Sequence, residues 1–215
     1  MKPTTNLDRC RIVLIAPAGV EATRVLAALS GGDVASLILP QWGMDDDAFQ
    51  AYAQDIVPAA QAAGVAVMIA GEPRIAARAK ADGLHVEGSK ATVADAVEKH
   101  QAKLTVGTGG ATTRDDALEL GEVQPDYIFF GRFGYDKKPE PHPRNLKLGQ
   151  WWSEMVQIPA IVLAGSDMES VAAVAATGVE FVALSAAVFN DNVDPAEAVA
   201  RANAILDERA PRLES

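Results

Sequence analysis

Short apolar runs rich in β-branched residues alternate along this chain with longer, alanine-rich amphipathic segments. A short uninterrupted apolar run is typical of a strand buried on both faces, whereas apolar positions three and four apart are typical of a helix. The predicted strands cover residues 12–16, 34–39, 65–70, 83–86, 104–106, 127–130, 160–163 and 181–184. The predicted helices cover residues 22–30, 45–63, 74–81, 91–100, 114–121, 148–155, 168–177 and 195–208.

Eight strands that alternate with eight helices predict a parallel sheet, because parallel neighbours need a crossover connection and a helix provides one. The count of eight favours a closed (β/α)₈ barrel, the TIM barrel of the α/β class. The alternative is an open sheet of the Rossmann type, but no predicted strand is followed by Gly-x-Gly-x-x-Gly. No linker divides the chain, so residues 1–215 are predicted to form a single compact barrel domain.

The loops that follow the strands are the places to look for a site, because ligands bind at the carboxyl ends of the strands in a TIM barrel. The longest of these loops, residues 131–147, is basic in its first part, where it carries Arg132, Lys137, Lys138, His142 and Arg144. This loop either holds an anion at the mouth of the barrel or is an ordinary exposed loop with solvated charges.

The seventh and eighth loops offer a second place for an anion. Gly165 and Ser166 follow the seventh strand, and Ser185 and Ala186 follow the eighth. Barrels often hold a phosphate between these two loops with backbone amides, and glycine lets the backbone approach the anion closely. The alternative is that Gly165 and Ser166 only form a tight turn, after which Asp167 caps the next helix.

Three further features each admit a structural and a functional interpretation. The glycine-rich fifth loop, residues 107–112, is interpreted as a flexible turn, with Thr112 or Thr113 capping the next helix. The three aspartates at 45–47 are interpreted as an acidic first helical turn and not as a metal site, because adjacent carboxylates point apart. His85 ends the fourth strand, where a hydrogen-bonded packing role is favoured over that of a base.

Composition limits the partners and the location of the protein. The formal net charge of -10 makes a phosphate backbone an unfavourable partner, so no nucleic acid is expected. The single cysteine, Cys10, excludes an internal disulfide framework, fits a reducing cytoplasm and is interpreted as a buried hydrophobe. Residues 1–11 show no signal peptide, and no apolar run approaches the roughly 18 residues that span a bilayer. A cytoplasmic protein without a membrane partner is therefore expected.

Several motifs, in this order along the chain, resemble those of thiamine phosphate synthases and their TenI-type relatives. Residues 81–85 (ADGLH) are similar to the family's A-D-G-x-H, and residues 126–131 (DYIFFG) are similar to its D-Y-x-x-x-G. Residues 158–160 (IPA), Gly165 and residues 182–185 (VALS) are similar to the last two units of the family.

The resemblance implies a (β/α)₈ barrel and a role in thiamine biosynthesis. Synthases of this family are transferases that join a pyrimidine pyrophosphate to a thiazole phosphate with Mg²⁺ and release pyrophosphate. TenI-type relatives bind the thiazole phosphate and isomerise its ring with a histidine. The resemblance therefore implies a small phosphorylated molecule as the ligand and a possible homodimer.

The sequence departs from the family where the metal and the pyrophosphate bind. The family's Q-L-R-x-K at the second strand appears here as residues 38–42 (ILPQW), without a cation. The metal-binding Asn-Asp pair falls on Ala70 and Gly71, with Glu72 one place later, and the second metal carboxylate falls on Lys90. Because both expected Mg²⁺ ligands are missing, no cofactor and no metal site are expected.

The sixth loop also departs from the family pattern. The family's G-P-I-F-x-T-x-T-K appears as residues 131–138 (GRFGYDKK), in which Lys137 or Lys138 stands in for the lysine. The histidine of TenI-type relatives corresponds to Arg132. The expected phosphate ligands are Arg132, Lys137, Lys138, Gly165, Ser166, Ser185 and Ala186, and the catalytic candidates are Arg132 and His85.

Four interpretations stay open on the residues alone. The chain is a family member with weak or no synthase activity, or a synthase whose site is rebuilt by Glu72, Glu87 and Arg132. It is otherwise a different barrel enzyme that acts on a small phosphorylated substrate, or a non-catalytic protein that binds a phosphorylated ligand. Metal dependence of ligand binding separates the rebuilt synthase from the binding protein.

Overall fold

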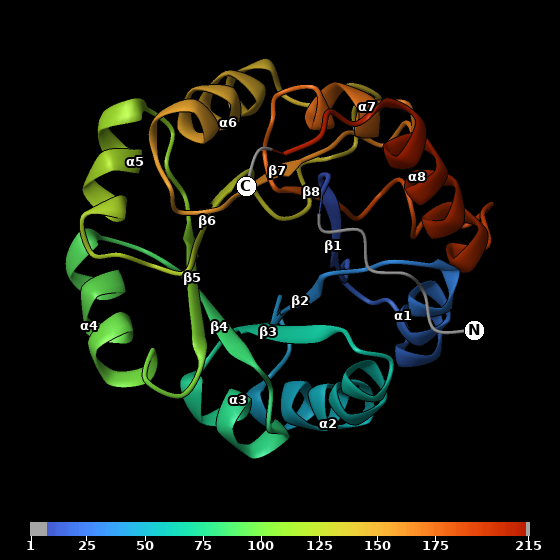
Figure 1. Ribbon diagram of the computed structural model, residues 1–215. Coiled ribbons are helices and arrows are strands. Elements are labelled where there is room, and N and C mark those ends of the chain that lie inside the picture. The colour runs from blue at the N-terminus through green and yellow to red at the C-terminus, as the bar shows by residue number, and fades with distance from the viewer. Residues whose placement is uncertain (1–7, 214–215) are drawn as a thin grey trace.

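Eight parallel strands close into a barrel, and the helices form a ring around it (Figure 1). The computed structural model describes residues 8–213. Outside this range lie residues 1–7 and 214–215. The expected absence of a signal peptide and the two ends of the predicted domain therefore fall on residues that are not described. The strands are β1 (Arg11–Ile15), β2 (Ser36–Pro40), β3 (Ala66–Ala70), β4 (Gly83–Glu87), β5 (Thr105–Gly109), β6 (Tyr127–Phe130), β7 (Ala160–Leu163) and β8 (Phe181–Leu184).

A helix follows each strand, as the alternating pattern predicted. The helices are α1 (Ala22–Ala28), α2 (Asp46–Ala62), α3 (Pro73–Ala79), α4 (Lys90–His100), α5 (Arg114–Gly121), α6 (Pro143–Met155), α7 (Ser170–Ala175) and α8 (Pro195–Arg209), with a 3₁₀ turn at Leu29–Gly31. Within residues 8–213 no helix has both the length and the apolarity needed to cross a bilayer.

Strand pairing follows the order of the chain and then closes on itself. Each strand pairs in parallel with the next, and β8 pairs with β1, where Leu14 lies opposite Leu184. Helices cover the outer face and packed side chains fill the inside, so the strands are apolar on both faces. The predicted TIM barrel is therefore confirmed, and the open-sheet alternative is wrong.

The inside of the barrel is a packed apolar core and not an open channel. Side chains from alternate strand positions meet there, as expected for strands that tilt around a closed barrel. The cluster consists of Val13, Ile15, Ile38, Met68, Tyr127, Phe129, Ile161, Leu163 and Ala183. Any ligand must therefore bind above this core, among the loops at the carboxyl ends of the strands.

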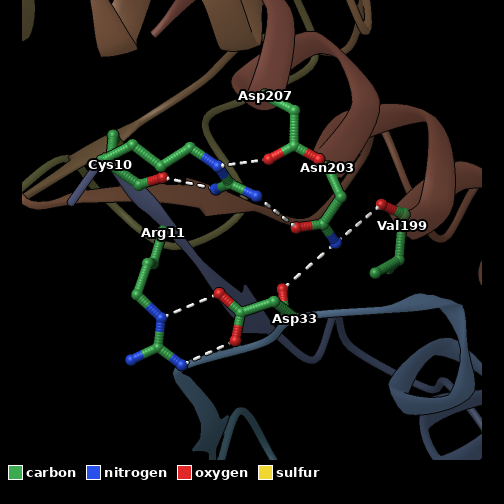
Figure 2. Close-up of polar contacts among 7 residues, drawn as sticks. Cys10, Arg11, Asp33, Val199, Asn203 and Asp207 are labelled. Carbon is green, nitrogen blue, oxygen red and sulfur yellow. Dashed lines mark hydrogen bonds and ion pairs between the residues drawn. The ribbon is translucent and has the colours of Figure 1, made fainter. Parts of the chain in front are cut away.

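Buried polar contacts tie the barrel together at the opposite end, where the strands begin (Figure 2). Arg11 donates two hydrogen bonds to the Asp33 carboxylate, at 2.8 and 2.7 Å, which link β1 to the segment before β2. Arg9 donates to Asp207 at 2.8 Å and to Asn203 at 3.1 Å, which link the start of β1 to α8. Cys10 lies fully buried among these residues, and burial raises the pKa of its thiol to about 12, which confirms its structural interpretation.

Two element boundaries differ from the prediction for identifiable reasons. β5 continues to Gly109, so residues 107–109 are strand and the predicted flexible loop is shorter. α6 begins at Pro143 and not at residue 148, because proline suits the first turn of a helix and His142 caps it by accepting a hydrogen bond from Arg144 N at 3.2 Å. The loop between β6 and α6, residues 131–142, is called the β6–α6 loop below.

Candidate functional site

A buried histidine lies at the carboxyl end of β4, just below the mouth of the barrel. His85 Nδ1 lies 3.0 Å from the hydroxyl oxygen of Tyr127 on β6, and the two rings stack at 5.7 Å. Burial raises the pKa of the Tyr127 phenol well above its ordinary value, so the hydroxyl stays protonated. The other ring nitrogen, His85 Nε2, is buried without a hydrogen-bond partner among residues 8–213, and Glu87 Oε1 lies 3.6 Å away.

Glycines of β5 make room for this histidine and tyrosine. A side-chain carbon added at Gly107 would lie 1.9 Å from Tyr127 Cζ, a distance that two unbonded carbons cannot adopt. A side-chain carbon at Gly109 would lie 3.2 Å from His85 Nε2 and 3.1 Å from Glu87 Oε1. The interpretation of residues 107–109 as a flexible turn is therefore wrong, since these glycines serve close packing in a strand.

Aromatic side chains cover His85 from above. The ring of Phe133, in the β6–α6 loop, lies 5.1 Å from the His85 ring and 5.4 Å from Phe129. Trp42, after β2, meets Phe133 edge-on at 6.3 Å and donates a hydrogen bond from Nε1 to Ala16 O at 3.1 Å. Neither Phe133 nor Trp42 was expected at the site from the sequence. The available signal was Trp42 itself, an aromatic residue at the position of a family lysine.

Basic side chains of the β6–α6 loop and of the first turn of α6 line a pocket of about 960 Å³ beside the barrel mouth. The charged side chains around it are Arg132, Lys137, Lys138 and Arg144, with Glu140 as the opposite charge. The Arg132 guanidinium lies 4.2 Å from the Tyr135 ring. In residues 8–213 the side chains of Lys137, Lys138 and Arg144 form no ion pair with a carboxylate. The structure thus brings the three cations that were predicted to bind phosphate, Arg132, Lys137 and Lys138, together in one positively charged pocket.

The loops after β7 and β8 are already engaged by the β6–α6 loop. Ser166 N donates to Lys138 O at 2.8 Å, and Asp167 N donates to Pro139 O at 3.2 Å. A side-chain carbon at Gly165 would lie 2.0 Å from Pro139 O, so this contact between the two loops requires glycine.

The eighth loop is engaged by a side chain of the same β6–α6 loop. Ala186 N donates to the carboxylate of Asp136, with an N–O distance of 2.6 Å. Ser185 is buried at the end of β8. The Gly165 amide is also occupied, since it donates to Ser170 Oγ at 3.0 Å. Three of the predicted phosphate-binding amides, those of Gly165, Ser166 and Ala186, therefore have partners within the chain, and phosphate binding by this group stays a prediction.

The positions where the family holds its metal carry other contacts. Lys90 forms an ion pair with Glu122, and this hydrogen bond raises the Lys90 pKa. Glu72 and Glu87 line a separate pocket of about 460 Å³ together with His85. Among residues 8–213 no three His, Cys, Asp or Glu side chains lie close enough to hold a metal ion.

Asp45 and Thr113 cap the helices that follow them. Asp45 accepts a hydrogen bond from Ala48 N at 2.8 Å, and Asp46 binds Gln41 and Arg74, which lower the Asp46 pKa. At α5, Thr113 Oγ1 accepts from Asp116 N at 3.1 Å while the Asp116 carboxylate accepts from Thr113 N at 2.9 Å. Both structural interpretations, the acidic helix start and the threonine cap, are confirmed.

Sequence comparison identifies the family. Residues 12–188 match the sequence model of the thiamine monophosphate synthase family. The thiamine-phosphate synthase of Rhodospirillum centenum is 31% identical over 202 residues, which cover 92% of this chain and 98% of the relative. The thiamine-phosphate synthase of Hyphomonas neptunium is 31% identical over 212 residues, which cover 94% of this chain and 96% of the relative.

Structural comparison agrees on the fold. The thiamine phosphate pyrophosphorylase of Pyrococcus furiosus superposes with a TM-score of 0.80 at 19% identity, over 95% of this chain and 98% of that protein. At this identity the superposition shows the shared barrel alone, and the family assignment depends on the sequence matches. This chain belongs to the thiamine monophosphate synthase family.

Proposed function

We propose that this protein binds a small phosphorylated ligand through the cations of the β6–α6 loop and does not carry out the ordinary synthase reaction of its family. The observation that carries the proposal is the basic pocket, whose cations Lys137, Lys138 and Arg144 form no ion pair with a carboxylate among residues 8–213. Free cations beside a barrel mouth are available to an anion, whereas cations held in ion pairs are not.

The family resemblance supports a phosphorylated ring compound as the ligand. The motifs on the thiazole-phosphate half are better kept than those on the pyrophosphate half. Arg132 suits a phosphate because its planar guanidinium donates two parallel hydrogen bonds to two oxygens. Lys137 and Lys138 add compact positive charge to the lining of the same pocket.

Loss of the synthase reaction is proposed from the chemistry of its leaving group. Pyrophosphate leaves with a large negative charge, which cations and a metal normally stabilise. At the corresponding loops Gln41 donates to Asp46 and Met44, and Trp42 takes the place of a lysine. Lys90 stands where a metal carboxylate is expected and is paired with Glu122.

A TenI-like isomerase is the second candidate, and the unpartnered Nε2 of His85 favours it. An isomerase needs a base that reaches the ring of its ligand, and His85 lies on β4 and lines a pocket of about 460 Å³. The Phe133 ring lies 5.1 Å from the His85 ring, so a ligand ring that reaches His85 would also contact Phe133.

Substitution of Arg132 tests the assignment of the β6–α6 loop. We expect Arg132→Ala to weaken binding of thiazole phosphate, measured by titration calorimetry, by at least about fivefold, because a charge-assisted contact is lost. Lys147→Ala is the matched control, since Lys147 is an exposed cation on α6 that does not line the pocket. Equal affinity in the Arg132 variant and the wild type would exclude this loop as the phosphate holder.

The proposal also includes a cytoplasmic location and a homodimeric state. The single cysteine, which is free and buried, supports the first, because disulfides form in oxidising compartments and are rare in a reducing cytoplasm. The family resemblance alone supports the second.

A further inference from the structure

Asp136 is a buried carboxylate in the middle of an exposed basic loop. Its side chain is 5% exposed, whereas the neighbouring Tyr135 is 65% exposed. Burial of a carboxylate is unfavourable unless strong hydrogen bonds compensate for the lost water. No Lys, Arg or His side chain pairs with Asp136 within residues 8–213, and its partner is the Ala186 amide at 2.6 Å. This short bond is of the charge-assisted kind that an anion forms with a backbone amide.

The same loop supplies further acceptors to the amides of the neighbouring loop. The carbonyl oxygens of Lys138 and Pro139 accept from Ser166 N and Asp167 N. Acceptors from one short segment therefore meet three amides that come from the two loops after β7 and β8. A phosphate group, with its several oxygens, presents acceptors of the same kind to a set of amides.

An aromatic ring from the loop accompanies this carboxylate. Phe133, three residues before Asp136, stacks on Phe129 with an angle of 25° between the rings and covers His85. One loop thus places an aromatic ring over the barrel mouth and a carboxylate against the Ala186 amide. The Phe133 ring corresponds to the ring of a ligand, and the Asp136 carboxylate corresponds to its phosphate. Together they resemble a phosphorylated aromatic ring compound.

We propose that the amides after β7 and β8 form an anion site that the chain fills with its own Asp136, and that a phosphorylated ring compound binds there by displacing Asp136 and Phe133. The inference rests on the proposed function, because the ligand that competes with Asp136 for the Ala186 amide is the phosphorylated ligand proposed above. It adds that the wild-type protein binds this ligand weakly, since each binding event must first open the β6–α6 loop.

Three substitutions distinguish two effects on ligand affinity: release of the Ala186 amide, and removal of negative charge from the loop. Asp136→Ala frees the Ala186 amide and removes a negative charge. Asp136→Asn removes the charge but keeps a side-chain oxygen that accepts from the amide. Glu140→Ala removes an exposed carboxylate that lines the basic pocket and forms no hydrogen bond in residues 8–213.

The measurement is titration with inorganic phosphate and with thiazole phosphate, followed by calorimetry and by the nuclear magnetic resonance signal of the Ala186 amide. We expect Asp136→Ala to bind thiazole phosphate about tenfold more tightly than the wild type, and the two charge controls to gain less than about threefold. The Ala186 signal should move when phosphate is added to Asp136→Ala.

Two results would overturn the inference. Equal gains for Asp136→Ala and Glu140→Ala would mean that only charge matters, and Asp136 would then be a fixed structural contact. If Asp136→Ala does not fold, the wild type is titrated to saturation, and an Ala186 signal that stays in place while calorimetry reports binding contradicts displacement. Failure of the Arg132→Ala prediction would concern the proposed function alone, because that variant leaves the Ala186 amide occupied.

Discussion

Whether a polar residue of this barrel serves the fold or the site depends on whether its neighbours satisfy it. Asp45 and Thr113 each accept the backbone hydrogen bond that a helix start leaves unpaired, so their roles end with the cap. His85 keeps a buried ring nitrogen without a partner, and the cations of the β6–α6 loop have no carboxylate partner among residues 8–213. Groups of this second kind are the ones available to a ligand.

Cys10 gives a direct test of burial at the residue scale. With a pKa near 12, its thiol is protonated at pH 8, and only a thiolate reacts with a disulfide reagent. We expect the native protein to react with such a reagent at least about a hundredfold more slowly than the same protein in denaturant. A native reaction rate equal to that of the denatured protein would show that Cys10 is exposed in solution.

The sequence predicted the helix caps better than it predicted the contacts of the candidate site, for a physical reason. Caps depend on neighbours three residues away, and the sequence displays them directly. The Asp136 contact joins residues 50 positions apart, and the cover of His85 joins Phe133 to a strand far earlier in the chain. Such contacts depend on where loops fold back, and local pattern carries no information on that.

At the scale of elements, periodicity identified every strand and helix of the barrel because each element is apolar where the fold buries it. The errors lie at the ends of elements. α6 begins earlier than the apolar pattern, since its first turn is polar and is set by His142 and Pro143. β5 ends later than the pattern, since Gly107 and Gly109 carry no apolar side chain to reveal a strand.

Gly107 provides the test at this scale. We expect Gly107→Ala to lower the free energy of unfolding by about 1–3 kcal/mol, because the added methyl group would overlap the Tyr127 ring. Gly43→Ala is the control, since nothing lies within 4 Å of a side-chain carbon at that position. Chemical denaturation measures both variants. A Gly107→Ala protein as stable as the Gly43→Ala protein would mean that β5 and β6 are not packed as described.

At the scale of the whole molecule, the buried polar contacts and the proposed site lie at opposite ends of the barrel. Buried contacts from Arg9, Arg11 and Asp33 close the end where the strands begin (Figure 2). The basic pocket and His85 lie where the strands end. This separation is the usual one in TIM barrels, whose loops vary while the opposite end holds the fold.

The separation predicts independent effects of substitutions at the two ends. We expect Asp33→Ala to lower the free energy of unfolding by about 1–3 kcal/mol, because Arg11 loses two hydrogen bonds from a buried pair. Its affinity for thiazole phosphate should equal that of the wild type under conditions where it is folded. Asp95→Ala, which breaks an exposed pair with Lys99, should leave stability unchanged. A loss of affinity in folded Asp33→Ala would contradict the separation.

The most direct test of the account is titration calorimetry with thiazole phosphate and with the pyrimidine pyrophosphate, each with and without Mg²⁺. The account predicts that thiazole phosphate binds with the same affinity in both conditions and that Mg²⁺ gives the pyrimidine pyrophosphate no added affinity. Binding of both compounds, with Mg²⁺ strengthening the second, would contradict it, because that result requires a working pyrophosphate and metal site of the kind a synthase needs.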